Sequence, residues 1–391
     1  MLKQLEGSQA VAEVVAMCRP QVISAYPITP QTHIVEELAK LVGEGRLEAE
    51  YINVESEFSA ASVVLGASAA GARAYTASTS QGLLLMTEVL YCIAGMRLPI
   101  VLTCANRAIS APLNIWNDHQ DSMTVRDAGW IQLHAEDNQE AADLHMQAFK
   151  IAEQTSLPVM VCMDGFILTH AFEPVDLPEQ KQVDDFLPPF NPPNALDPRA
   201  PKGIGLYADP RFYMETRYIL HRALEKSKST IQQVSAGFAR DFGRDSGGLI
   251  KTYKLEGADL AIVTMGSVVG SVKDLIDRLE EEGKRVGLLQ ICSYRPFPRQ
   301  EVYKALKEHT NIVVLEKSIS LGRGGILGSD VRWSFPRAEK KGRLISSYVA
   351  GLGGRNISLE DLRAMVARVE KEPVELEFLG LRKEIIAERD L

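Results

Sequence analysis

Three polar side chains in the first third of the chain have types and positions suited to ligand chemistry. Thr29 lies between Pro27 and Pro30, and each proline restricts its own backbone and that of the preceding residue. Glu57 follows an apolar segment and could direct a carboxylate at a ligand nitrogen. Arg107 also follows an apolar segment, and arginine is suited to bidentate contact with a carboxylate. These residues are therefore candidates for ligand binding.

Glu57 also has a simpler, structural interpretation. Ser56 could cap the helix that follows, and Glu57 would then be an acid in its first turn, which the helix dipole favours. Glu55 lies two residues earlier and could take either role. The helix is rich in Ala, Ser and Gly, which permits close packing against a neighbouring helix or subunit. The residues alone leave both interpretations open.

The loop that contains Arg107 carries several more polar residues. His119, between Asp118 and Asp121, could suggest metal or acid–base chemistry. The spacing matches no metal-binding motif, so we expect a partly exposed loop histidine without a catalytic role and predict no metal ligands in this chain. The five cysteines contain no CxxC pair, which argues against an iron–sulfur or zinc site formed by this chain alone. Most of them are expected to be buried thiols of a cytoplasmic protein.

The glycine clusters "GRGG" (322–325) and "GLGGR" (351–355) are expected to form turns. Neither completes the G-x-G-x-x-G pattern, so a dinucleotide-binding dehydrogenase is disfavoured. The net charge is -8 and no basic stripe is present, so nucleic acid is not an expected partner. No apolar run is long enough to span a bilayer, so no membrane association is expected.

Short apolar segments alternate with helical patterns, which predicts an α/β fold with parallel sheets. Ligands of such sheets bind beyond the carboxyl ends of the strands. Thr29, Glu57, Ser80 and Arg107 each follow a predicted strand, so we expect them at one sheet edge. The predicted strands of this first block are Val22–Tyr26, Tyr51–Val54, Ala74–Ala77, Ile100–Cys104 and Val159–Met163, and the predicted helices are Thr32–Val42, Phe58–Ala70, Gln81–Ala94 and Gln139–Gln154.

The length of 391 residues suggests two domains or three. We expect a first domain over 1–171 and a second over 246–391, where a new α/β pattern starts near Leu260. Between them, 172–245 is expected to form a proline-rich arm, over 172–202, and a helical connection with a helix over 211–226. We expect this arm to wrap a partner.

Several motifs together resemble the alpha subunits of the 2-oxoacid:ferredoxin oxidoreductase family, in particular multi-subunit pyruvate:ferredoxin oxidoreductase (pyruvate synthase). They are "YPITP" (26–30), "ESE" (55–57), "TSQGLLLM" (79–86), "RAISAPLNIWNDHQD" (107–121), "SYRPFP" (293–298) and "GRGG". The resemblance implies a thiamine pyrimidine-binding domain followed by a transketolase C-terminal-like domain. It also implies thiamine diphosphate-dependent oxidative decarboxylation of pyruvate, with coenzyme A, to acetyl-CoA and carbon dioxide, with reversible reduction of ferredoxin.

The resemblance also implies roles for residues and partners. Glu57 would hydrogen-bond the aminopyrimidine of thiamine, and Thr29 and Arg107 would hold pyruvate. Pro27, Ile28 and Thr29 would contact the cofactor. Mg²⁺ and the diphosphate would be shared with a partner, and [4Fe-4S] clusters would lie on beta, gamma and delta-type subunits. Another 2-oxoacid, oxalate, or a non-catalytic assembly role are the alternatives that the sequence leaves open.

Overall fold

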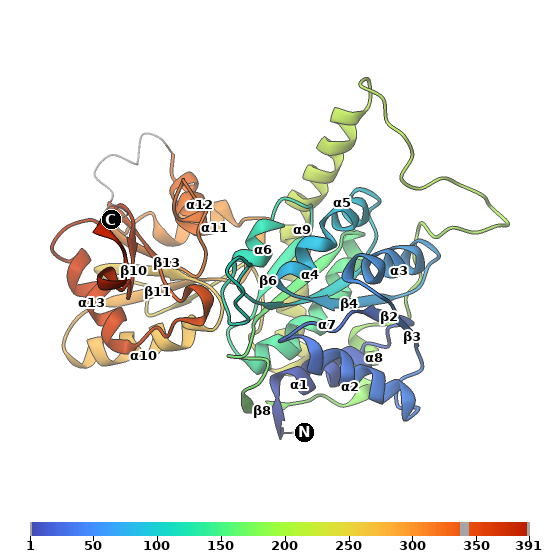
Figure 1. Cartoon of the computed structure of the whole chain (residues 1–391), viewed down its shortest axis with the longest axis horizontal. Coiled ribbons are helices and arrows are strands. Elements are labelled where there is room, and N and C mark those ends of the chain that lie inside the picture. The colour runs from blue at the N-terminus through green and yellow to red at the C-terminus, as the bar shows by residue number, and fades with distance from the viewer. Residues whose placement is uncertain (1, 337–343, 389–391) are drawn as a thin grey trace.

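The computed structural model describes residues 2–336 and 344–388 and contains two sheet-based units side by side (Figure 1). The sheet of the first unit has seven strands in the order β12-β6-β7-β5-β4-β2-β3. All neighbours are parallel except β12, which pairs antiparallel with β6. The strands are β2 (Val22–Ala25), β3 (Glu50–Asn53), β4 (Ala74–Ser78), β5 (Val101–Asn106), β6 (Ile131–His134), β7 (Val159–Asp164) and β12 (Ser293–Arg295).

Helices cover both faces of this sheet. On one face α1 packs against α2 and α7, and on the other α3 packs against β2, β4 and α5 (Figure 1). The central strands β4, β5 and β7 are buried along their whole length, as expected for a parallel sheet between two helical layers. The helices are α1 (Gly7–Met17), α2 (Thr32–Gly43), α3 (Glu57–Ala69), α4 (Ser80–Leu85), α5 (Thr87–Gly95), α6 (Gln120–Thr124) and α7 (Asn138–Thr155).

The second unit has a six-stranded sheet in the order β15-β14-β13-β10-β11-β9. It is parallel except for β9, which pairs antiparallel with β11. Its strands are β9 (Ile250–Tyr253), β10 (Leu260–Thr264), β11 (Val286–Ile291), β13 (Asn311–Glu316), β14 (Leu344–Val349) and β15 (Glu377–Phe378). Its helices are α10 (Val268–Glu281), α11 (Arg299–Leu306), α12 (Ile326–Ser334) and α13 (Leu359–Val369).

The structure confirms the predicted strands and helices of the first block, with ends shifted by two residues at most, apart from one break. The expected helix over 81–94 is two helices, α4 and α5, which meet at Met86. Several other elements of the first unit were not predicted, among them α1 and β6. The helix expected over 211–226 is longer and runs as α9 (Tyr213–Phe242), because apolar residues at helical spacing continue to Phe238 and pack on the first unit.

The expected arm over 172–202 is only partly an arm. Its beginning lies on the first unit, because β8 (Phe172–Asp176) pairs antiparallel with β1 (Leu2–Glu6). The next helix, α8 (Gln180–Phe186), buries Val183 and Phe186 in the core of that unit. The segment between α8 and α9 does extend away from the body of the molecule, and the start of α9 projects with it (Figure 1).

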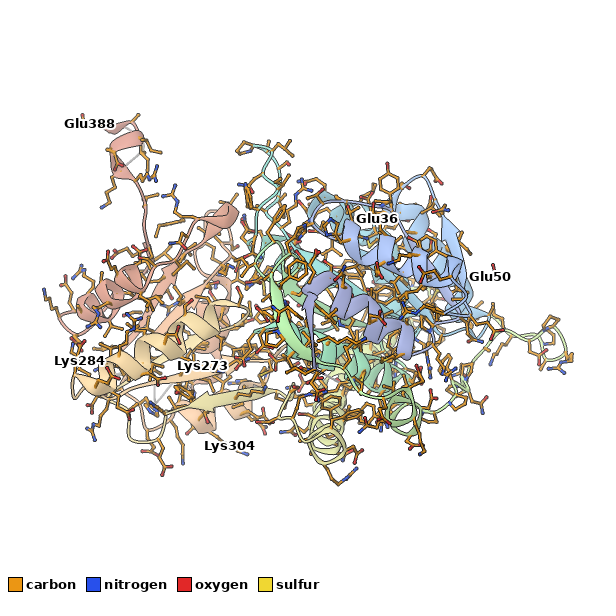
Figure 2. All side chains as sticks on the ribbon, turned by 90° about the horizontal axis from the view of Figure 1, so that it is seen from below. Glu36, Glu50, Lys273, Lys284, Lys304 and Glu388 are labelled. Carbon is orange, nitrogen blue, oxygen red and sulfur yellow. The ribbon has the colours of Figure 1, made fainter. Side chains whose placement is uncertain are left out.

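Buried and half-buried ion pairs join the two units. Asp164, at the end of β7, accepts a hydrogen bond from Lys317 Nζ at 2.8 Å and one from Ser267 Oγ at 2.5 Å. On the surface, Lys273 of α10 lies 2.8 Å from a carboxylate oxygen of Glu136; Figure 2 labels Lys273 among the charged side chains of the second unit. Together with β12, these contacts fix the first sheet relative to the second.

The cluster at 322–325 forms a turn, as predicted, whereas the cluster at 351–355 contains a short 3₁₀-helix, Leu352–Gly354. Gly322 and Gly324 have φ angles of 76° and 113°, and Gly351 has a φ of 66°, all in the region that glycine tolerates best. Across the described residues, no helix combines the length and apolar character needed to cross a membrane.

Candidate functional site

The four polar residues that the sequence places beyond strand ends do lie at one edge of the first sheet. Thr29 comes four residues after β2, Glu57 opens α3 after β3, Ser80 opens α4 after β4, and Arg107 directly follows β5. Strands β3, β2, β4 and β5 are consecutive neighbours, and all four are parallel. Their carboxyl ends therefore bring these side chains to a single region of the sheet edge.

Arg107 contacts the turn that carries Thr29. Its Nη1 donates a hydrogen bond to the backbone carbonyl oxygen of Thr29 at 2.8 Å, and its Nε donates to the carbonyl oxygen of Asn114 at 3.0 Å. Burial lowers the pKa of Arg107 and the nearby Asp121 opposes this, but a guanidinium stays charged at neutral pH. Arg107 is buried whereas Thr29 is exposed, so the pair presents a fixed positive charge beside an accessible hydroxyl.

Gln31 stabilises this turn, a role that the sequence analysis missed. Its side chain is fully buried, and its Oε1 accepts a hydrogen bond from the backbone N–H of Ile28 at 3.2 Å. Its Nε2 donates to the carbonyl oxygen of Ala77, on the neighbouring strand β4, at 2.7 Å. The turn is therefore held by Gln31 as well as by the restricted prolines, Pro27 and Pro30.

Glu57 combines the two interpretations that the sequence left open. Ser56 caps α3 by accepting a hydrogen bond from the backbone N–H of Ser59, so Glu57 is indeed an acid of the first turn. Its side chain, however, is buried against Gly82, where an added Cβ would lie 2.6 Å from Glu57 Oε1. Within residues 2–336 and 344–388, no group donates a hydrogen bond to this carboxylate. This unpaired carboxylate, in a side chain that is only 7% exposed, is a group that a ligand could satisfy.

Glu55, the competing acid, lies at the surface. Its carboxylate accepts a hydrogen bond from the hydroxyl of Ser59, which lowers its pKa. Because Glu55 is exposed and already has a hydrogen-bond partner, Glu57 is the better candidate for a buried ligand contact.

Asp121 organises the site from behind. This fully buried carboxylate accepts hydrogen bonds from the backbone N–H groups of Ser80 and Arg107, both at 2.9 Å, and from Asn106 Nδ2 at 2.8 Å. Burial raises its pKa, and these donors lower it. Asp121 thus joins the start of α4 to the start of the Arg107 loop. Sequence spacing could not reveal this contact, because residues 80, 107 and 121 come together only in the folded chain.

The expectation that His119 is partly exposed was wrong. The histidine is completely buried, and its Nε2 lies 2.6 Å from Asp164 Oδ1. The physical reason is that the second unit covers the loop. The backbone N–H of His119 donates a hydrogen bond to the carbonyl oxygen of Lys317, and Gly266 lies against the imidazole. Burial would raise the pKa of Asp164, but the adjacent Lys317 and His119 hold it well below its usual value. This cluster connects the two units.

Comparison with known proteins gives the family. Residues 13–236 match the model described as pyruvate flavodoxin/ferredoxin oxidoreductase, thiamine diphosphate-binding, and 258–362 match pyruvate:ferredoxin oxidoreductase core domain II. The chain belongs to the pyruvate:ferredoxin oxidoreductase family. A pyruvate synthase subunit PorA of Methanosarcina barkeri is 47% identical over 98% of this chain and 97% of the relative, and one of Methanocaldococcus jannaschii is 50% identical over 95% of each.

Two other oxidoreductases are also similar, one in sequence and one in fold. A ketoisovalerate oxidoreductase subunit VorA of Pyrococcus horikoshii is 40% identical over 94% of each chain. A solved 2-oxoglutarate:ferredoxin oxidoreductase of Magnetococcus marinus shares the fold at a TM-score of 0.72 and 22% identity, covering 95% of this chain and 65% of that one. These findings confirm the expected family, the α/β fold with mainly parallel sheets and the assignment as a subunit of a thiamine diphosphate-dependent 2-oxoacid oxidoreductase.

Proposed function

We propose that this chain is the alpha-type subunit of an enzyme that decarboxylates pyruvate oxidatively, using thiamine diphosphate and coenzyme A and passing electrons to ferredoxin. The buried, unpartnered carboxylate of Glu57 carries the proposal most directly, because it offers a thiamine ring the carboxyl group that such a cofactor needs. The pyruvate synthase subunits are 47% and 50% identical to this chain, whereas the ketoisovalerate oxidoreductase subunit is 40% identical. This difference supports pyruvate over ketoisovalerate as the substrate.

Glu57 would hold the pyrimidine ring of the cofactor. Thiamine diphosphate, when bound, supplies a carbanion and then an electron sink at its thiazolium carbon. The Glu57 carboxyl group would donate a hydrogen bond to a pyrimidine ring nitrogen, and would pass its proton to that nitrogen as the neighbouring amino group becomes a base. Gly82 leaves room for the carboxylate to stay in this position, and Pro27 and Ile28 would contact the cofactor from the neighbouring strand end.

Arg107 and Thr29 would bind the substrate. A guanidinium with N–H groups left over after two carbonyl contacts can bind the pyruvate carboxylate. The exposed Thr29 hydroxyl would donate to the keto oxygen. The hydrogen bond between Arg107 and the Thr29 carbonyl holds the guanidinium and the Thr29 hydroxyl at a fixed separation. This lowers the entropic cost of orienting the substrate.

Partner chains would complete the enzyme. This sequence has no GDG-type motif for Mg²⁺ and diphosphate and no cysteine run for [4Fe-4S] clusters, so beta, gamma and delta-type subunits would supply them. The segment between α8 and α9 and the start of α9 would contact a partner, because large apolar side chains are exposed there. They are Leu206, Tyr207, Phe212, Tyr213, Met214, Tyr218 and Ile219. The five free thiols support a reducing, cytoplasmic location.

The proposed domains are 1–171 and 246–391, with a connection over 172–245, although β12 of the second domain pairs with the first sheet. Oxalate is disfavoured as a substrate, because a second carboxylate would call for further positive charge beside Arg107. A non-catalytic assembly role is disfavoured by the buried Glu57, which no assembly function explains.

The assembled complex, supplied with coenzyme A and ferredoxin, tests the proposal when it is assayed with a set of 2-oxoacids. Pyruvate should give a kcat/KM at least about tenfold above those for 2-oxoisovalerate and 2-oxoglutarate. Each of these two acids has a larger side chain than pyruvate, and a difference of that size changes kcat/KM by roughly tenfold or more. A higher kcat/KM for 2-oxoisovalerate or for oxalate would contradict the choice of pyruvate. Absence of cofactor-dependent turnover with every 2-oxoacid would contradict the catalytic role.

A further inference from the structure

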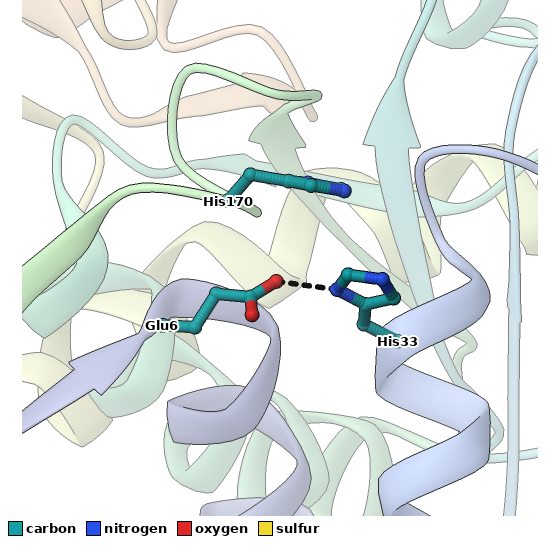
Figure 3. A group of neighbouring side chains, drawn as sticks. All are labelled: Glu6, His33 and His170. Atoms are coloured by element: carbon teal, nitrogen blue, oxygen red, sulfur yellow. Dashed lines mark hydrogen bonds and ion pairs between the residues drawn. The ribbon is translucent and has the colours of Figure 1, made fainter.

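Three side chains far apart in the sequence meet beside the Thr29 turn. Glu6 ends β1, His33 is the second residue of α2, and His170 lies in the loop between β7 and β8. Figure 3 shows the carboxylate of Glu6 directed at the imidazole of His33, with the ring of His170 above them. Their candidate ligand atoms all lie within 4.8 Å of one another.

Backbone hydrogen bonds hold this cluster in place. The N–H of Gly7 donates to the carbonyl oxygen of Ala171 at 3.1 Å, and the N–H of Ser8 donates to that of Thr169 at 3.0 Å. The residues next to Glu6 are therefore fixed to the residues next to His170 before any ligand arrives. Only His33 comes from a separate element, and its side chain is 46% exposed, so it is free to adjust.

The contacts between the side chains suit a shared ligand. Glu6 Oε1 lies 2.6 Å from His33 Nδ1, and the two imidazole rings lie 4.6 Å apart at their centroids. His170 Nδ1 lies 2.8 Å from the hydroxyl of Thr169. When Nδ1 donates its proton there, the other ring nitrogen keeps its lone pair, which is the usual arrangement of a metal-binding histidine.

We propose that Glu6, His33 and His170 form a binding site for a divalent transition-metal ion, with Zn²⁺ as the best match. Two imidazoles and one carboxylate are a typical zinc set, with bonds of about 2.0–2.2 Å and a water molecule as the fourth ligand. The imidazoles disfavour Mg²⁺ and Ca²⁺, which prefer oxygen ligands. The present separations exceed those of a closed site, and rotation of the exposed His33 side chain would close it.

The electrostatics of the cluster favour a cation. Without an ion, the Glu6 carboxylate contacts the His33 imidazole, while His170 contacts the Thr169 hydroxyl. A bound metal ion would satisfy all three groups together.

The site would tie the N-terminal strand to the substrate edge of the sheet. His33 lies four residues after Thr29, and the loop that carries His170 begins at Gly165, where an added Cβ would lie 2.6 Å from Pro30 Cγ. A metal ion would therefore connect β1, the Thr29 turn and the loop after β7. It would stabilise the turn without touching the substrate.

Equilibrium dialysis of the assembled complex against zinc chloride, followed by elemental analysis, tests this site independently of activity. The wild-type complex should hold one more zinc ion per copy of this chain than complexes with His33→Gln or Glu6→Gln. Each variant should bind this ion about tenfold or more weakly. Excess Mg²⁺ should not displace it.

His221→Gln, on the exposed face of α9, is the matched control and should bind zinc as the wild type does. His33→Gln removes a half-exposed ligand, so this variant should fold normally. Equal zinc contents in the wild-type and His33→Gln complexes would overturn the proposal, whether that content is high or zero. A loss of zinc in His221→Gln equal to that in His33→Gln would also overturn it.

Discussion

Arg107 Nη1 lies 2.8 Å from the backbone carbonyl oxygen of Thr29, so the two residues proposed to bind substrate are directly joined. Thr29 follows β2 and Arg107 follows β5, with β4 between these strands in the sheet. The contact sets the distance between a cation and a hydroxyl that originate 78 residues apart. Substrate binding should therefore depend on Arg107 both as a charge and as a support for the turn.

Arg107→Ala should raise the KM for pyruvate strongly while the complex keeps its thiamine diphosphate. Loss of a charge-assisted contact costs about 1.5–3 kcal/mol, or roughly ten- to a hundredfold in KM. Steady-state kinetics and cofactor content measure the two effects separately. Arg97→Ala is the matched control, because Arg97 also donates to two carbonyls, of Thr155 and Ser156, but precedes β5 at the opposite edge of the sheet. Equal loss of pyruvate and cofactor binding in Arg107→Ala would show that this residue is only structural.

Gly82→Ala should weaken thiamine diphosphate binding by about tenfold or more, because the new Cβ would displace the Glu57 carboxylate from its position 2.6 Å away. Titration of the cofactor into the depleted complex measures the effect. Gly43→Ala, at the end of α2, has nothing within 4 Å of its added Cβ and should leave cofactor binding unchanged. Normal binding in Gly82→Ala would mean that the pocket does not need Glu57 where it now lies.

The buried imidazole of His145 should make the stability of the fold depend on pH. Its imidazole is buried in α7, lies 2.6 Å from Thr103 Oγ1, and has its pKa lowered to about 4 by burial. The unfolded chain binds a proton near pH 6.5, so it holds more protons than the folded chain between pH 6.5 and 4. The free energy of unfolding should fall as pH falls through this window, by about 2 kcal/mol from this group between pH 7 and 5.

Denaturant unfolding of the purified chain at pH 7 and pH 5 measures this dependence. In His145→Gln the part of the decrease due to this group should disappear, although the variant starts from lower stability at pH 7. A pH dependence in His145→Gln as steep as in the wild type would show that other groups dominate the acid sensitivity.

The chain expressed alone should contain no iron–sulfur cluster and show no pyruvate oxidation. It has the residues that we propose to bind substrate. Its five cysteines are scattered, however, and it lacks a motif for Mg²⁺ and diphosphate. Iron analysis and a pyruvate-dependent dye-reduction assay measure the two properties. A brown preparation of the single chain with activity would contradict the assignment of these groups to partner subunits.

The sequence predicted most of the fold, because the parallel strands are short apolar runs and most of the helices between them are strongly periodic. It also placed Thr29, Glu57, Ser80 and Arg107 at one sheet edge, since parallel strands direct their carboxyl ends to the same side. It could not show that β12 crosses to the first sheet, that the second unit covers His119, or that Asp121 supports Arg107. These depend on contacts between residues far apart in the chain, for which local patterns carry no signal.

The proposed metal site illustrates the same limit. Glu6, His33 and His170 have no recognisable spacing, and they meet only because β1 pairs with β8 and α2 begins beside the loop after β7. The sequence analysis expected no metal ligands in this chain because it considered only local spacing.

The central claim is that the Glu57 carboxylate partners the thiamine pyrimidine, and hydrogen–deuterium exchange at thiamine C2 in the assembled complex tests it most directly. Glu57→Gln keeps the shape of the side chain but cannot share a proton with the ring, so C2 exchange should slow by roughly two or more orders of magnitude. Glu55→Gln, two residues away at the surface, should exchange at the wild-type rate. Near-normal exchange in Glu57→Gln, or a larger defect in Glu55→Gln, would contradict the account.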